Sequence, residues 1–372
     1  MTLRYAVIGA GMMGQEHIRN ISLLDDTAVA VIVEPNDQMA VLATNVAVTH
    51  GLPAPKRLKD IAELLHAHEI NAIDALLVAS PNDLHFGMMQ KLLETNLPIL
   101  LEKPVATDVD QAWALVAQAQ RRAAPIWVAM EYRYIPPVAR IIEEVRNGTV
   151  GEAKIISIVE HRFPFLQKVG DWNRFSARTG GTMVEKCCHF FDLMRLITAS
   201  EPTRVFGSGG CDFNHQDERY DGMKPDILDN ALVIVDFENG MRASLDLCMF
   251  ADGSYWQEHV SIVGNQGKVE AFVPGPSRFW PGGIERASEV VISPRFDKAP
   301  TRQEVHVPQE LLAAGDHHGS TYFQHKKFAE LVRRQKGVPD VTLRDGAIAV
   351  EMGNAAERSI RTRELVHLKN RA

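Results

Sequence analysis

Long hydrophobic runs and an excess of positive charge are both missing from this 372-residue sequence. No stretch approaches the roughly 18 consecutive apolar residues that indicate a membrane span. The net charge is −7, from 40 Lys+Arg and 47 Asp+Glu, so there is no electrostatic reason to bind nucleic acid or an anionic membrane. The N-terminus lacks the basic and apolar segments of a signal peptide. These absences predict a soluble protein that acts on a small molecule.

Cysteine is also scarce, with only Cys187, Cys188, Cys211 and Cys248. None of them forms a C-x-x-C pair, so a disulfide framework is not expected and a reducing cytoplasm is the natural location. Cys187-Cys188-His189 could suggest zinc, but three adjacent residues on a helix cannot all face one ion. The sequence therefore predicts no metal site.

The length exceeds that of one ordinary core, so two domains are expected. In residues 1–130, apolar runs typical of buried strands alternate with helical patterns. The expected strands are Leu3–Gly9, Ala28–Val33, Ile73–Ala79, Pro98–Leu101 and Ile126–Met130. This alternation predicts an α/β fold that begins with a doubly wound parallel sheet, the Rossmann type, which binds dinucleotides.

Residues 131–372 are predicted to form an α+β domain with a large, mostly antiparallel open sheet. Its expected strands are Ala153–His161, Arg204–Gly207, Ala231–Phe237, Met241–Phe250, His259–Val263, Lys268–Phe272 and a final one near Leu365–Leu368. Helices are expected over Thr182–Ile197, Thr321–Gln335 and Arg344–Arg361. A broad sheet with one uncovered face predicts a homodimer or homotetramer, and the cleft between the domains is the expected site of chemistry.

The cofactor motif is Gly9-Ala10-Gly11-Met12-Met13-Gly14, which follows a strand and opens a helix. Its three glycines suit the tight turn, the approach of the pyrophosphate and close helix packing. Glu34 ends the second strand 20 positions later and can accept hydrogen bonds from a ribose diol. No arginine follows it in Pro35–Gln38, which favours NAD over NADP. A methyltransferase, whose glycine loop is similar, is the alternative interpretation.

Two further segments follow predicted parallel strands, where open α/β sheets bind their ligands. The first is Ser80-Pro81-Asn82 with His85, and the second is Glu102-Lys103-Pro104. Proline fixes the second turn and Glu102 can anchor it, so the Lys103 ammonium would be aimed into the cleft.

Gly180-Gly181 precedes a predicted helix in which Glu185, His189 and Asp192 form one stripe. Burying three ionisable side chains is costly unless they are paired or used. The stripe is therefore either a functional site or a structural network in which His189 hydrogen-bonds both acids.

Together these motifs resemble the glucose–fructose oxidoreductase / inositol dehydrogenase / MocA family. The resemblance also includes Met130-Glu131-Tyr132-Arg133-Tyr134 and Ala355-Ala356-Glu357-Arg358-Ser359. It implies oxidation of a secondary hydroxyl of a sugar, inositol or related polyol, a catalytic role for Lys103 and oligomerisation through the open sheet. The residues expected to bind NAD are Gly9, Gly11, Met12, Met13, Gly14, Glu34, Ser80, Pro81, Asn82, His85, Glu102, Lys103 and Glu131. The family pattern is Asp-x-Gly-x-His-x-x-Asp, from which Glu185 and Cys187 depart.

The predicted mechanism is hydride transfer, which requires a positioned base for the hydroxyl proton. Imidazole suits neutral pH better than an amine, so His189 is assigned as the base and Lys103 as the donor to the alkoxide. Glu185 or Asp192 would orient the imidazole. Substrate contacts are expected from Lys103 and His189 themselves, and from Arg162, Trp172, Asn173, His317 and His318. Two rival functions are an NAD-assisted glycoside hydrolase or lyase and a non-catalytic NAD-binding regulator.

Overall fold

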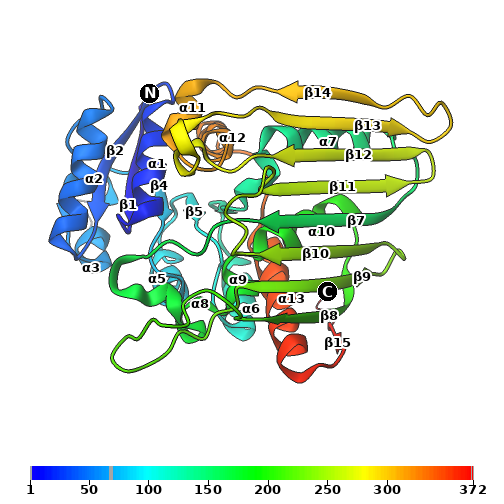
Figure 1. Cartoon of the computed structure of the whole chain (residues 1–372). Coiled ribbons are helices and arrows are strands. Elements are labelled where there is room, and N and C mark those ends of the chain that lie inside the picture. The colour runs from blue at the N-terminus through cyan, green and yellow to red at the C-terminus, as the bar shows by residue number, and fades with distance from the viewer. Residues whose placement is uncertain (1, 67–69, 370, 372) are drawn as a thin grey trace.

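The computed structural model describes residues 2–66, 70–369 and 371, and it contains two sheets (Figure 1). The first sheet has the strand order β3-β2-β1-β4-β5-β6, and every pair is parallel. Its strands are β1 Leu3–Ile8, β2 Thr27–Val33, β3 Lys56–Leu58, β4 Ala75–Val78, β5 Ile99–Leu101 and β6 Ile126–Val128. The predicted Rossmann sheet is confirmed.

Helices connect these strands and cover both faces of the sheet, as a doubly wound fold requires. They are α1 Met12–Ser22, α2 Asp37–Thr49, α3 Ile61–Leu65, α5 His85–Leu92 and α6 Val109–Ala119. Strand β3 was not predicted, because it spans three residues directly after two prolines and only Leu58 of it is buried. Its pairing with β2, rather than its own pattern, makes it a strand.

The second sheet has nine strands in the order β14-β13-β12-β11-β7-β10-β9-β8-β15. These strands are β7 Ala153–His161, β8 Pro202–Gly210, β9 Asn230–Phe237, β10 Arg242–Cys248, β11 Glu258–Gly264, β12 Gly267–Val273, β13 Ser288–Pro294, β14 Thr301–Val305 and β15 Val366–His367. Only the β7–β10 pair is parallel, so the mostly antiparallel sheet is confirmed. Strands β13 and β14 were not predicted, since β14 is almost wholly exposed and shows no apolar alternation.

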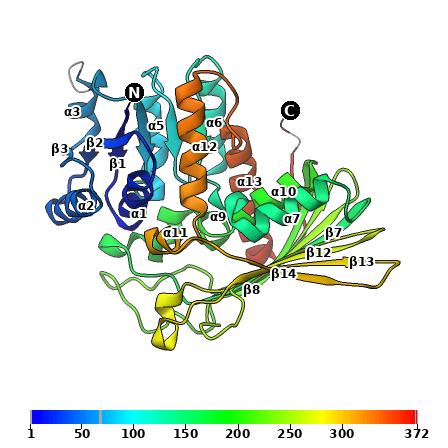
Figure 2. The ribbon, with the colours of Figure 1, turned by 90° about the horizontal axis from the view of Figure 1, so that it is seen from above.

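Helices cover one face of this sheet, as the edge-on view shows (Figure 2). The covering helices are α7 Pro136–Arg146, α10 Cys188–Thr198 and α13 Leu343–Thr362. The short helix α11 Gln309–Ala314 and the longer α12 Ser320–Arg334 both contact α1, which ties the second domain to the first. On the other face, Ile155, Phe206, Leu232 and Ile234 are exposed apolar side chains.

The predicted helix Thr182–Ile197 is wrong in one respect that matters for the site. It is divided into α9 Thr182–Glu185 and α10 Cys188–Thr198, which follow the short helix α8 Ser176–Thr179. Glu185 therefore ends one helix while His189 and Asp192 lie on the next, so the three side chains do not form one helical stripe. In the part of the chain that the structure describes, no helix is long and apolar enough to cross a membrane.

Candidate active site

The glycine loop has the geometry that a bound dinucleotide requires. Gly9 has φ +92°, and a Cβ there would lie 2.7 Å from the backbone of Ala79 and Ser80. A Cβ at Gly14 would collide with the Gly9 carbonyl, whereas one at Gly11 would meet no atom within 4 Å. The space above Gly11 and the start of α1, at Met12 and Met13, is therefore open to a diphosphate.

Glu34 is a buried carboxylate already held by backbone N–H groups. The amide of Ala10 donates to Glu34 Oε2 and that of Asn36 to Glu34 Oε1, both at 2.8 Å. The expectation that no arginine is near is wrong, because Arg57 on β3 donates to the Glu34 carbonyl at 3.1 Å. That guanidinium also pairs with Asp37 at 2.6 Å, so it is committed to local partners. The tertiary pairing of β3 with β2 brings it there.

Ser80 and His85 differ in how their side chains are hydrogen-bonded. Ser80 Oγ is buried and has no hydrogen-bond partner in the described residues, which fits a group that a cofactor would satisfy. His85 is fully buried between the carbonyls of Pro104, at 2.7 Å, and Ser80, at 3.0 Å. His85 therefore joins two loops instead of offering a free nitrogen to the cofactor, contrary to the sequence-based expectation. Asn82, after Pro81, is also buried, and its amide lies 3.5 Å from the Thr179 carbonyl.

Lys103 crosses from the first domain to the second. Its Nζ donates to the Glu185 carbonyl at 2.9 Å, and the Lys103–Pro104 peptide bond is cis. Glu102 anchors this turn, since it accepts from His17 Nε2 at 2.9 Å and from the Lys103 amide at 3.2 Å. Burial lowers the pKa of Lys103, but electrostatic interactions with Cys188, Glu102 and Glu185 outweigh it and raise the pKa above its usual range. The lysine is therefore a cation in the site.

His189 is a neutral imidazole in the same place. Its ring stacks on Tyr132 with centroids 4.2 Å apart and an angle of 8° between the planes. His189 Nδ1 is buried without a hydrogen-bond partner in the described chain. Burial, followed by the charges of Lys103, Lys186 and His317, holds the pKa of His189 well below its usual range. The structure thus brings the predicted cation and the predicted base together.

Glu185 and Asp192 do not orient this imidazole. Glu185 Oε1 pairs with Lys168 Nζ at 2.9 Å, and Glu185 Oε2 is buried without a partner in the described residues. Asp192 forms a two-bond ion pair with Arg133, in which Nε lies 2.6 Å and NH2 2.5 Å from the carboxylate oxygens. The hypothesis that Asp192 positions His189 disagrees with this geometry, because Arg133 occupies both of its oxygens.

A buried cluster of charged side chains contacts Tyr132. Lys186 Nζ donates to the Tyr132 hydroxyl at 2.6 Å and pairs with Glu160 Oε1 at 2.8 Å. Glu160 and Glu258 are directly opposed on neighbouring strands, and both are buried. Burial and the neighbouring Glu160 carboxylate raise the pKa of Glu258 to about 7. The Lys186 amine was not found by sequence reasoning, since its position next to Glu185 resembles an exposed helix residue.

A second cluster, formed by Glu16, Glu131 and His317, joins both domains. His317 Nδ1 lies 2.7 Å from Glu16 Oε1 and 3.6 Å from Glu131 Oε1. Thr321 Oγ1 donates to Glu16 at 3.0 Å and also to Glu131. One ligand atom from each member lies within 4.8 Å of the others, a spacing that a metal ion could use. The cluster is hydrogen-bonded within itself, which places Glu131 in an ion-paired network and not free toward a cofactor.

The adjacent histidines differ in charge. Burial alone would lower the pKa of His317, but Glu131 and Glu16 outweigh it and raise the pKa to about 10. His318 Nε2 is bound to the Pro274 carbonyl at 2.7 Å, and burial lowers its pKa to about 4. His317, whose ring lies 6.3 Å from that of Tyr132, is therefore the better candidate for a substrate contact. Sequence alone could not choose between two neighbouring histidines.

Residues 162–175 connect β7 to α8 and include the 3-10 helix Val169–Arg174. Arg162 lies over the ring of Phe163 at 4.2 Å, with NH1 3.5 Å from Glu160 Oε1. Trp172 is nearly buried beneath Lys168, whose Nζ lies 4.4 Å from the ring centroid. Asn173 is fully buried, donates to the Leu166 carbonyl at 3.0 Å and has an unpartnered Oδ1 in the described residues. Asn173 thus ties this segment to Leu166, whereas Arg162 contacts Phe163 and Glu160, and Trp172 contacts Lys168.

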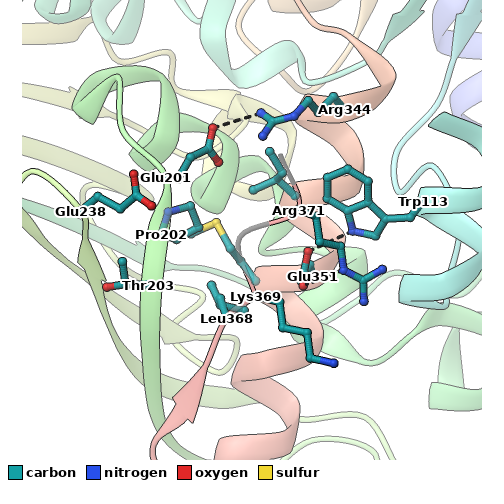
Figure 3. Close-up of a pocket in the computed structure, with 12 residues that line it drawn as sticks. Trp113, Glu201, Pro202, Thr203, Glu238, Arg344, Glu351, Leu368, Lys369 and Arg371 are labelled. Carbon is teal, nitrogen blue, oxygen red and sulfur yellow. Dashed lines mark hydrogen bonds and ion pairs between the residues drawn. The ribbon is translucent and has the colours of Figure 1, made fainter. Parts of the chain in front are cut away.

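A separate hollow near the C-terminus contains none of these residues (Figure 3). Two of its carboxylates are already bound, since Glu351 accepts from Trp113 Nε1 at 2.9 Å and Glu201 pairs with Arg344 at 3.0 Å. The hollow is a seam between α6, β8 and α13 and is not a candidate active site.

Comparison with known proteins agrees with this arrangement. Residues 3–130 match the oxidoreductase family's NAD-binding Rossmann fold, and residues 142–368 match its C-terminal alpha/beta domain. The chain is 30% identical over 270 residues to an inositol 2-dehydrogenase of Arthrobacter sp. (strain FB24), covering 72% of this chain and 75% of the relative. It is 23% identical over 369 residues to a myo-inositol 2-dehydrogenase of Thermotoga maritima, covering 99% of each.

Among solved structures, levoglucosan dehydrogenase in complex with NADH has a TM-score of 0.80 at 18% identity, covering 99% of this chain and 100% of that one. GenD2 from gentamicin A biosynthesis in complex with NAD has a TM-score of 0.76 at 19% identity, with 99% and 97% covered. These likenesses establish the fold. The chain belongs to the Gfo/Idh/MocA oxidoreductase family, with an NAD-binding Rossmann domain.

Proposed function

We propose that this protein is a dehydrogenase that transfers a hydride between NAD and the carbon bearing a secondary hydroxyl of a sugar, inositol or related polyol. The observation that carries the proposal is the contact of Lys103 with Glu185. It holds a cationic donor of the first domain against the segment that leads into His189 of the second. Inositol 2-dehydrogenases among the relatives support this substrate class.

His189 and Lys103 have different roles in the removal of the hydroxyl proton. Oxidation of an alcohol releases the hydroxyl proton as the carbon loses a hydride, so a neutral base and a cation that stabilises the alkoxide are both useful. His189 is the neutral base because its pKa is lowered by burial and by nearby cations. Lys103 stays protonated and donates to the substrate oxygen. NAD supplies the hydride acceptor when bound, and Gly9, Gly11, Gly14 and Ser80 would hold it.

The preference for NAD over NADP is part of the same proposal. A 2′-phosphate would approach the Glu34 carboxylate, and the repulsion of like charges disfavours it. Arg57 does not offset this repulsion, because its guanidinium is bound to the Glu34 carbonyl and to Asp37.

The test is a screen for NAD reduction over inositols, aldoses and glycosides, read by the absorbance of NADH. We expect turnover with at least one of these polyols, and Lys103→Met to lower kcat by about 10²–10⁴-fold. Binding of NADH, followed by fluorescence, should stay close to that of the wild type. Lys326→Met, at an exposed position on α12, is the matched control and should keep full activity.

Three outcomes would contradict the proposal. Near-native turnover of Lys103→Met would remove the lysine from the mechanism. Release of an aglycone without accumulation of NADH would indicate the NAD-assisted glycoside hydrolase. Tight NADH binding with no turnover of any compound would favour the regulator.

The quaternary structure is also proposed, as a homo-oligomer formed through the uncovered face of the large sheet. Leu232 and Ile234 on β9 are 60% and 53% exposed, and an apolar patch of this kind is typical of an interface. Leu232→Asp should lower the molar mass in light scattering. Val338→Asp, at a more exposed apolar position away from the sheet, should leave it unchanged, and an unchanged mass for Leu232→Asp would contradict the proposal.

A further inference from the structure

A cavity of about 510 Å³ runs beside the glycine loop. One wall is formed by Met12, Glu16 and Arg19 of α1, whose spacing places them in one stripe along the helix. The rest of the lining comes from segments 275–278, 285–286 and 312–318 and from Leu166. The diphosphate is expected at the N-terminal end of α1, whereas the cavity continues along the side of that helix.

The inner end of the cavity adjoins the reaction centre. Glu16, which lines it, is bound to His317 at 2.7 Å, and His317 lies beside the Tyr132 ring on which His189 stacks. On the outer side, Phe279 packs on Phe163 with centroids 4.1 Å apart, next to Arg162. The cavity therefore lies beside the groups of the reaction centre, from which Glu16 and His317 separate it.

The charges of the lining are balanced. Three guanidinium groups, from Arg19, Arg278 and Arg286, face three carboxylates, from Glu16, Glu285 and Asp316. Arg278 Nε binds Asp316 at 2.8 Å and Arg19 Nε donates to the Ala314 carbonyl at 2.9 Å. Of these cations, Arg278 is neutralised by a carboxylate, whereas the carbonyl bound by Arg19 is uncharged, so the lining is not a cluster of ion pairs alone. The lining instead offers donors and acceptors side by side, which suits neutral hydroxyl groups.

Arg286 of the lining is stacked on two aromatic rings. The Arg286 guanidinium lies 3.7 Å from the centroid of Trp280 and 4.3 Å from that of Tyr255. Stacked planar groups that also carry N–H donors suit both faces of a sugar, its apolar C–H groups and its hydroxyl edge.

We propose that this cavity binds a second sugar ring, so that the substrate is a glycoside or an oligosaccharide whose terminal ring reacts. The inference rests on the proposed function, since it places that terminal ring between Lys103 and His189. Pockets for small-molecule ligands measure about 300–1,000 Å³, and the cavity falls within this range. A single polyol ring at the reaction centre would leave it empty.

The first experiment measures binding without turnover. The wild-type protein with NADH cannot oxidise an alcohol, so calorimetry reports saccharide affinity alone. The probes are gluco-, galacto- and manno-configured sets, each with a free monosaccharide, its methyl glycoside and a disaccharide ending in that ring. In at least one set, we expect the disaccharide to bind about tenfold more tightly than the monosaccharide, as one or two added hydrogen bonds to charged groups would give.

Two variants test whether the cavity is the cause. Ala313→Trp fills the cavity from an exposed lining position, and Arg286→Ala removes the stacked guanidinium. Both should lose the disaccharide advantage, about tenfold, while monosaccharide affinity changes less than about twofold. Arg295→Ala is the matched control, because Arg295 also lies over a ring, that of Phe296 at 5.5 Å, but is exposed on the turn between β13 and β14.

The outcomes separate this inference from the proposed function. Equal affinity for monosaccharide and disaccharide in every set, absence of saccharide binding, or equal losses for both ligands in the two variants would each overturn the second-ring site. If the disaccharide advantage and its loss in the variants are seen but no saccharide reduces NAD, the site stands and the dehydrogenase proposal fails.

Discussion

The two sides of the reaction centre differ in how completely their polar groups are paired. On the first-domain side, both oxygens of Glu102 accept hydrogen bonds, and His17 continues the chain to His325 through nitrogens 2.8 Å apart. On the second-domain side, Glu185 Oε2 and His189 Nδ1 are buried and have no hydrogen-bond partner in the described residues. The turn around Glu102 is therefore closed, whereas the segment around Glu185 and His189 is incomplete.

A buried polar atom without a partner costs about 1–3 kcal/mol, so it is retained where a ligand or a water supplies the missing bond. The turn around Glu102 needs no such supply, because both Glu102 oxygens are already hydrogen-bonded and fix the turn that carries Lys103. We infer that the lysine is held in place before any ligand binds. The incomplete side gains its remaining hydrogen bonds from the ligand, and its substitutions should therefore affect turnover most.

His189→Asn should give the largest effect, a loss of about 10²–10⁴-fold in kcat. Asparagine keeps a polar side chain of similar reach but cannot accept the proton. Because the pKa of His189 is held below its usual value of about 6.5, the imidazole stays unprotonated through the neutral range. Wild-type kcat/KM should accordingly fall only in acid below that value, as the base becomes protonated.

The same variant tests the assignment through its pH profile. The acidic fall should disappear in His189→Asn, while NADH binding is kept. A variant that retains both the acidic fall and more than about a tenth of wild-type kcat would show that another group is the base.

The predicted fold agrees with the structure where a run of residues carries its own pattern. Strand β7 has the predicted bounds Ala153–His161, since buried and exposed positions alternate over much of it. Strand β3 and the contacts of Arg57 could not be predicted, because they depend on a neighbouring strand. The local sequence pattern thus predicted strands such as β7. It could not predict β3, which depends on its pairing with a neighbouring strand.

The candidate site shows the same division. Lys103 and His189 were predicted from motifs, and the structure places both at the junction of the domains. Asp192 was misassigned because a helical repeat shows which residues share a face but not which partner they meet. That partner, Arg133, is 59 positions away. The cluster of Glu16, Glu131 and His317 joins three distant segments and has no sequence pattern.

The Asp192→Asn variant tests whether Asp192 stabilises the fold or takes part in catalysis. The side chains of Arg133 and Asp192 are 8% and 2% exposed, so removal of the anion leaves a buried guanidinium without its counter-charge. We expect the free energy of unfolding to fall by about 3–5 kcal/mol, measured by urea titration. The fraction that remains folded should keep kcat within about twofold of the wild type, because Asp192 does not contact His189.

Two further variants sharpen this comparison. The double variant Arg133→Met/Asp192→Leu should recover most of the lost stability, as apolar replacement of a buried ion pair does. Glu330→Gln breaks the exposed pair with Arg334 and should not change stability measurably. If the Asp192→Asn protein is stable but has lost most of its kcat, Asp192 takes part in catalysis after all.

The smallest effect is expected where the two sides meet, at His317. Its pKa in the folded protein is about 10, above the value of about 6.5 for a free side chain. The stabilisation from its ion pairs is therefore complete below about 6.5 and is lost as the pH rises toward 10. In urea titrations, the stability difference between wild type and His317→Gln should be larger at the acidic end of this range than at the alkaline end.

His318 provides an internal control of opposite sign. Burial lowers its pKa to about 4, so the folded protein resists protonation of this ring, and the wild type loses stability relative to His318→Gln as the pH falls from about 6.5 toward 4. Two adjacent histidines should thus respond in opposite directions to acid. Equal and pH-independent differences for both variants would show that Glu16 and Glu131 do not hold a charged His317, and the two sides of the cleft would then not be joined by an ion pair.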